Sequence, residues 1–111
     1  MIEKILYDYL TTEQNLTVYM EQPASKTASF YILEKTAGGQ TDKVNQATIV
    51  VQSYADTLYN AASMNETVKA AMSEAIELNE VSRVELNSDY NYTDPNTKQY
   101  RYQAVFVVTF Y

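Results

Sequence analysis

Apolar and polar residues alternate along the last twelve residues of the chain, 100–111. The even-numbered positions are aromatic or apolar: Tyr100, Tyr102, Ala104, Phe106, Val108 and Phe110. Because successive side chains of a strand point to opposite faces, this pattern predicts one long strand. Val105 and Val107 make its second half apolar on the other face too, which a solvated edge strand does not tolerate. We expect cover on both faces, from the chain's own helices or from another subunit.

Two segments repeat their apolar residues with the period of an amphipathic helix. Residues 2–10 carry one apolar stripe, formed by Ile2, Ile5, Leu6, Tyr9 and Leu10. A longer stripe runs through residues 54–78, formed by Leu58, Ala61, Ala62, Val68, Met72, Ala75 and Ile76. Ser53 and Asp56 stand three positions apart directly before it, a spacing similar to that of a capping box. The pattern therefore predicts a short helix and a long one.

Other runs rich in β-branched and aromatic residues predict strands at residues 16–20, 29–34, 47–53 and 81–92. The apolar centre of 47–53 indicates an interior position in the sheet. Residues 36–42 surround the only two glycines, Gly38 and Gly39, and predict a hairpin loop. Residues 93–97 contain Pro95 and Asn96 and predict a turn.

The predicted order is α-β-β-β-α-β-β, which indicates an α+β fold of two layers. We expect a mixed or mostly antiparallel sheet packed against the helices. No segment has the length or bias of a linker, a repeat or a second domain. Residues 1–111 are therefore expected to form a single domain.

The composition excludes several kinds of site. The chain has neither cysteine nor histidine, which removes thiolate zinc sites, cysteine nucleophiles and the commonest general base. Its net charge of −6 argues against nucleic-acid binding, which needs a basic face. No apolar run approaches the roughly 20 residues of a membrane span, and the first residues lack a signal-peptide layout. We expect a cytoplasmic protein with no cofactor, no metal, no membrane contact and no enzymatic activity.

Two groups of carboxylates are candidates for a calcium site or an acid–base pair: Asp89 with Asp94, and Glu74 with Glu77 and Glu80. A calcium loop needs several oxygen ligands at close spacing and a glycine for the turn, and neither group has them. The pattern favours a solvated helix face and a polar loop instead.

Eleven tyrosines are the strongest bias of the composition. Tyr90, Tyr92, Tyr100 and Tyr102 stand on either side of one predicted turn, so pairing of the flanking strands would make a cross-strand aromatic ladder. Two interpretations stay open. The ladder either fixes the register and covers the core, or it forms a subunit interface, since a small domain does not bury this many phenols with their hydroxyls satisfied.

Five stretches carry a resemblance to a known family: MIEKILYDYL at 1–10, VYMEQP at 18–23, FYILEKT at 30–36, QSYA at 52–55 and RYQAVF at 101–106. In these stretches and in its element order, the chain resembles the small tail-terminator or tail-completion proteins of long-tailed phages. Such proteins occur in prophages of Gram-positive bacteria and are often described as minor capsid or head-tail joining proteins. The family has no catalytic signature.

The resemblance implies a compact subunit with helices packed on a mixed sheet. It also implies a ring, usually of six subunits, that caps the tail tube and offers a surface to the head connector. Such a protein would assemble in the bacterial host cytoplasm and remain in the virion. Tyr100 and Tyr102 would then contribute to packing between subunits. The loop containing Gly38, Gly39, Asp42 and Lys43 would face the tube or the connector.

Two hypotheses of function follow. The first is a structural assembly protein that forms a homo-oligomeric ring; the second is a small binding module that uses the aromatic hairpin against a host or phage protein. An enzyme is a distant third. The terminal strand links these hypotheses to the fold. If the 2–10 helix does not cover the face that carries Val107 and Tyr111, that face is expected to be an interface.

Overall fold

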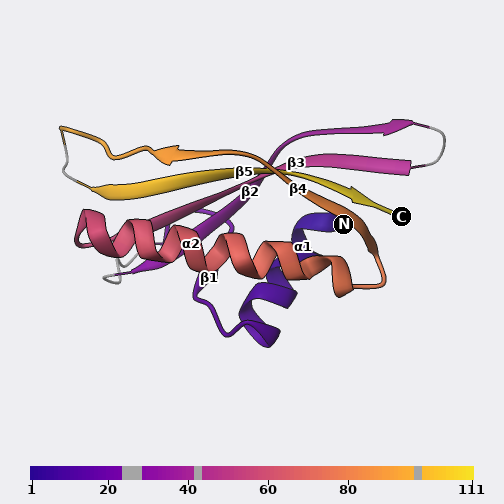
Figure 1. Ribbon diagram of the computed structural model, residues 1–111, viewed down its shortest axis with the longest axis horizontal. Helices are drawn as coiled ribbons and strands as arrows, with labels where there is room; N and C mark the ends of the chain where they lie inside the picture. Colours follow the sequence, from indigo (N-terminus) through magenta and orange to yellow (C-terminus); the bar gives the residue numbers. More distant parts are fainter. Residues whose placement is uncertain (24–28, 42–43, 97–98) are drawn as a thin grey trace.

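A computed structural model describes residues 1–23, 29–41, 44–96 and 99–111 of the chain (Figure 1). Its helical elements are α1 (Ile2–Asp8), the π-helical turn η1 (Tyr9–Glu13), α2 (Leu58–Glu74) and the 3-10 turn η2 (Ala75–Glu77). Its strands are β1 (Val18–Tyr19), β2 (Phe30–Thr41), β3 (Val44–Ala55), β4 (Val81–Asn91) and β5 (Tyr100–Phe110). The expected order is matched in outline, with β1 reduced to two residues.

The five described strands form one mixed sheet in the order β1-β2-β3-β5-β4. β1 runs parallel to β2, and every other neighbouring pair is antiparallel. The interior position predicted for residues 47–53 is confirmed, because β3 pairs with β2 on one side and β5 on the other. Figure 1 shows α1 and α2 on the same side of this sheet. The fold is therefore mixed α+β, as the sequence predicted.

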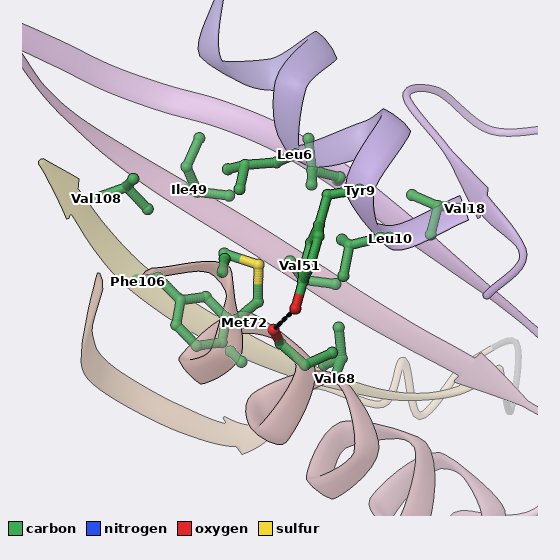
Figure 2. Close-up of a cluster of buried hydrophobic side chains, with 14 of the residues drawn as sticks. Leu6, Tyr9, Leu10, Val18, Ile49, Val51, Val68, Met72, Phe106 and Val108 are labelled. Carbon is green, nitrogen blue, oxygen red and sulfur yellow. Dashed lines mark hydrogen bonds between the residues drawn. The ribbon is translucent and has the colours of Figure 1, made fainter. Parts of the chain in front are cut away.

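The core lies between the sheet and the helices, and Figure 2 shows its centre. The apolar stripe of the N-terminal helical segment contributes Leu6 and Leu10, and the stripe of α2 contributes Val68 and Met72. The sheet contributes apolar residues from alternate positions of its interior strands: Ile49 and Val51 from β3, and Ala104, Phe106 and Val108 from β5. The apolar residues that recur with a period of 3.6 in the helices and of 2 in the strands thus pack together in one core.

The buried side chain of Tyr9 connects the N-terminal segment to the end of α2 (Figure 2). Its hydroxyl donates a hydrogen bond of 2.8 Å to the main-chain oxygen of Ala71. An α-helix would pair that oxygen with the N–H of Ala75, but this N–H donates to Met72 as the helix tightens. The tyrosine therefore supplies a donor where the helical ladder ends.

The predicted capping box at Ser53 and Asp56 is wrong. Ser53 lies inside β3 and is fully buried, because the strand continues to Ala55. Helix α2 begins at Leu58, and its N-cap is Thr57, whose Oγ1 accepts a hydrogen bond of 3.1 Å from the N–H of Asn60. A second residue with the same capping chemistry, a few positions along, serves as the cap.

The predicted loop at residues 36–42 is wrong for 36–41, because β2 continues to Thr41. Gly38 pairs with Ala47 and Gly39 with Gln46, so both glycines are strand residues. The glycines remain in the strand because their backbones pair with β3, which is itself paired with β5 on its other side. Asp42 and Lys43 lie outside the described residues.

The sheet is longer than the helical layer. The molecule extends 44 Å along its longest axis and 25 Å and 24 Å along the others. Figure 1 shows the β2–β3 hairpin projecting beyond the helices at one end of the sheet, whereas at the other end the β4–β5 connection extends only slightly past the start of α2. In that connection, Asp94 and Gln99 form an isolated bridge. Each molecule therefore presents a projecting hairpin at one end, the β4–β5 connection at the other, and one broad sheet face.

Candidate functional site on the uncovered face of the sheet

The two faces of β5 have different surroundings. Ala104, Phe106 and Val108 are buried in the core beneath the helices, so the face of β5 that carries the even-numbered residues meets the helical layer. Val105 and Val107 point to the opposite face and are only half-buried. The 2–10 helix does not cover them, because α1 lies on the same side of the sheet as α2 (Figure 1). We call the side without helices the outer face.

One end of the outer face is a row of aromatic rings. The ring of Tyr19 meets Phe30 edge-on, with centroids 5.9 Å apart, and Phe30 stacks on Tyr54 at 4.8 Å. The guanidinium of Arg101 follows, 5.7 Å from the centroid of Tyr54 and 4.5 Å from that of Tyr92. This row crosses from β1 to the end of β4. It therefore fixes five side chains across the whole width of the sheet.

Beside the aromatic row runs a chain of hydrogen bonds. The Tyr54 hydroxyl donates to Oε1 of Gln52 at 2.8 Å, and Nε2 of Gln52 donates to Oε1 of Gln103 at 2.8 Å. Nε2 of Gln103 then donates to the Tyr90 hydroxyl, and Nη1 of Arg101 donates to the Tyr54 hydroxyl at 2.9 Å. Polar side chains on this part of the sheet thus satisfy one another and hold defined positions.

The centre of the outer face is aliphatic. Val50 on β3 pairs directly with Val105 on β5, and Thr48 pairs with Val107. These residues face outward without a helix over them. Thr48, Val105 and Val107 are half-buried, and Val50 is 5% exposed. The second side of the terminal strand is therefore apolar, as expected, and no helix covers it in the single chain.

Toward the β2–β3 hairpin the outer face is hollowed. A depression of about 380 Å³ is lined by Ala37, Gly38, Gly39, Gln40, Gln46, Ala47, Thr48 and Val107. A Cβ added at Gly39 would meet no atom within 4 Å, so the absence of side-chain volume there helps to form the depression. The predicted candidates Gly38, Gly39 and Val107 are brought together here.

The predicted ladder of four tyrosines is wrong. Leu86 pairs with Phe106 on the helix side, but the register shifts between Leu86 and Ser88, and Tyr90 then pairs with Gln103 on the outer face. A bulge of one residue exchanges the two faces of a strand. Tyr90 and Tyr92 therefore lie on the outer face, with their rings 5.9 Å apart.

The other two tyrosines of the predicted ladder belong to the helix side. Tyr102 pairs with the buried Ser53, and Tyr100 pairs with Ala55. Tyr111, beyond the end of β5, is 77% exposed, and its N–H donates to the main-chain oxygen of Glu80 at 3.0 Å. The candidate tyrosines are thus divided among both faces and the end of the sheet.

Of the candidate carboxylates, Asp89 has structural partners on α2. Oδ2 of Asp89 accepts hydrogen bonds of 2.9 Å from Nζ of Lys69 and Nδ2 of Asn65, which joins β4 to α2. The hydrogen bond from Lys69 lowers the pKa of Asp89, and the bond from Asn65 acts in the same direction against the opposing effect of burial. Among the described residues, no three acidic side chains are placed to hold a metal ion.

Sequence reasoning missed Arg101, Gln52 and Gln103 as surface residues. The signal was present, since glutamine in the middle of two strands otherwise rich in valine is typical of strands with one solvated face. Its meaning depended on the sheet order, because only adjacent strands β3 and β5 bring the two glutamines together.

A comparison with protein-family models and with curated proteins finds no match for the chain. Among the described residues, no helix has the length and apolar character needed to cross a membrane.

Proposed function

We propose that this protein is a structural subunit of virion assembly, a tail terminator or tail-completion protein that forms a ring, caps the tail tube and joins it to the head connector. The observation that carries the proposal is the outer face of β5, where Val105 and Val107 are only half-buried and no helix lies over the sheet. An aliphatic sheet face of this kind is typical of a surface that another protein covers.

The form of the subunit supports the same proposal. The β2–β3 hairpin and the β4–β5 connection lie at opposite ends of one sheet (Figure 1), so a single subunit has separate surfaces for different partners. In the proposed arrangement, six copies form the ring, and these two ends meet the tail-tube protein and the connector. The resemblance of the sequence to tail-terminator proteins points in this direction. The ring would form in the cytoplasm of the bacterial host and become part of the virion.

The proposed role is structural rather than catalytic. The chain contains no histidine or cysteine, and its best-defined polar cluster, the hydrogen-bonded row of Gln52, Gln103 and Tyr90, is made of amides and a phenol. These groups have no ready acid or base near neutral pH. A rigid row of satisfied polar groups is better suited to recognition of a protein surface.

A second candidate function rests on the aromatic end of the outer face. Tyr90 and Tyr92 are 41% and 45% exposed, and Arg101 lies against Tyr92. Tyrosine and arginine are the residue types that most often dominate binding energy at interfaces. A small binding module that uses this end against a host or phage protein would form a defined complex of two different chains and no ring.

Electron microscopy of the purified protein, with and without the tail-tube protein of the same phage, separates these functions. The proposed function predicts rings, either free or at the ends of assembled tubes, and tubes of limited length when the protein is present. Tubes of unchanged length with bare ends would contradict it. A complex with a host protein, together with bare tubes, would support the binding module.

A further inference from the structure

The charges of this chain are unevenly distributed over its surface. The helical elements α1, η1, α2 and η2 carry six acidic residues against two lysines. Among the described residues, the outer face carries few charges, and they balance: Arg83 pairs with Glu85 at 2.7 Å, and Arg101 stands on the same face as Glu34. The acidity of the molecule therefore lies mainly on the helical side, and the outer face is close to neutral.

This distribution restricts how two copies meet. A contact between two helical layers brings acidic residues against acidic residues, in a chain whose net charge is −6. A contact that includes an outer face avoids this repulsion, because that face presents valine, threonine and glutamine at its centre. Charge thus selects the outer face for contact with a second copy.

The outer face also comes close to the size of a standard interface. Four of its strands are 11 or 12 residues long. At a spacing of about 4.8 Å between strands and a rise of about 3.3 Å per residue, they span roughly 700 Å². A standard interface buries about 800 Å² on each partner. Counted over the full length of these strands, the projecting segments included, the face therefore comes close to the size of a standard interface.

The side chains of this face are already ordered in the single chain. Gln52 and Gln103 bond to each other, and Arg101 donates from Nε to the main-chain oxygen of Tyr92 at 2.7 Å. Groups that are fixed before binding lose little conformational entropy when a partner covers them. The side chains of the outer face thus have the positions needed for binding before a partner is present.

We infer that the outer face is the surface through which one copy of this chain contacts the next, with the aliphatic centre around Thr48, Val105 and Val107 buried in the contact. This inference rests on the self-assembly proposed above and assigns it a surface. In a closed ring, where contacts are head-to-tail, each copy contributes its outer face to one neighbour.

The test compares two substitutions that add the same charge. Thr48→Lys places a lysine at the aliphatic centre of the outer face, and Thr67→Lys places one on the exposed side of α2, where the threonine hydroxyl donates to the oxygen of Ser63. Sedimentation equilibrium over a wide concentration range measures self-association of the wild type and both variants. Thermal melting checks that each variant is folded, and Gln46→Lys, also on this face, replaces Thr48→Lys if the latter unfolds.

We expect the wild type to self-associate, Thr48→Lys to weaken the association at least about tenfold because the contact buries an unpaired charge, and Thr67→Lys to change it less than about twofold. Equal weakening by both variants or no weakening by Thr48→Lys would overturn the inference. If the wild type is monomeric alone, the same comparison is made with the tail-tube protein added, and rings formed by Thr48→Lys as well as by the wild type would then overturn it. None of these results decides the proposed function, which the appearance of tube ends tests separately.

Discussion

The guanidinium of Arg101 lies 4.5 Å from the ring centroid of Tyr92 and donates a hydrogen bond of 2.7 Å to the main-chain oxygen of the same residue. Arg101 is on β5, and Tyr92 directly follows β4. The pair fastens the last strand pair of the sheet at the end that carries the β4–β5 connection. It also places an aromatic and a cationic group together on the outer face, so one contact serves both the fold and the proposed interface.

Replacement of Arg101 by methionine tests this double role. Methionine keeps the aliphatic stem but removes the cation–π contact and the donors to Tyr92 and Tyr54. We expect a loss of about 1–2 kcal/mol in the free energy of unfolding, measured by urea denaturation. Arg83→Met is the matched control, because Arg83 is more exposed and, within the part of the chain that the structure describes, its ion pair is with the exposed Glu85 alone. Equal losses for the two variants would contradict the structural role of Arg101.

Tyr9 gives a prediction about the core. Tyr9→Phe keeps the buried ring but removes the hydroxyl that donates to the main-chain oxygen of Ala71 at the end of α2. We expect the free energy of unfolding to fall by about 1–2 kcal/mol, because a buried acceptor loses its donor. Tyr59→Phe, at a position 80% exposed, is expected to change stability by less than about 0.5 kcal/mol. A Tyr9→Phe variant as stable as the wild type would show that the bond is unimportant.

The stability of the protein is expected to fall at alkaline pH. Burial raises the pKa of Tyr31 from its ordinary value of 10.0 to about 12, and burial also raises the pKa of Tyr9. The folded chain then keeps phenolic protons that the unfolded chain has lost, so this contribution is complete below pH 10 and is lost as pH rises toward 12. Thermal melting between pH 8 and pH 12 measures the fall. Tyr31→Phe is expected to show a shallower one, and an identical profile would contradict the assignment.

Replacement of the glycines of β2 is expected to raise the stability of the protein. Gly39→Thr adds a side chain where a Cβ meets no atom within 4 Å, and no glycine has a positive φ. We expect a gain of about 0.5–1 kcal/mol, because glycine weakens a strand. Gly38→Thr is expected to gain less, since its Cβ would lie 3.0 Å from Cε of Lys35. A melting temperature that falls for Gly39→Thr would show that the strand there is not formed.

Much of the fold could be predicted from the sequence. The alternation in residues 100–111 identified β5, including the apolar character of both faces, because the period of two survives along an interior strand without a bulge. The stripe predicted for α2 was correct in its middle, where Val68 and Met72 are buried, and wrong near its ends, where Leu58 and Ile76 are exposed. Regular periods are the signals that a single sequence carries best.

The incorrect predictions arose where a local sequence signal competes with the pairing of strands in the folded sheet. Gly38 and Gly39 indicated a loop, but pairing with β3 extends the strand through them. The tyrosine ladder failed because a bulge after Leu86 moves Tyr90 to the opposite face, and no residue type marks that insertion. The outer face itself required the sheet order, which places Gln52 beside Gln103. Local composition does not determine which strands become neighbours.

The most direct measurement of the central claim images the wild type, Thr48→Lys and Thr67→Lys by electron microscopy, each mixed with the tail-tube protein. If copies meet through the outer face to cap the tube, the wild type and Thr67→Lys place rings at tube ends, whereas Thr48→Lys, folded by its melting curve, leaves the ends bare. Rings formed equally well by Thr48→Lys would contradict the outer face as the contact between copies. Bare tube ends with the wild type would contradict the capping role.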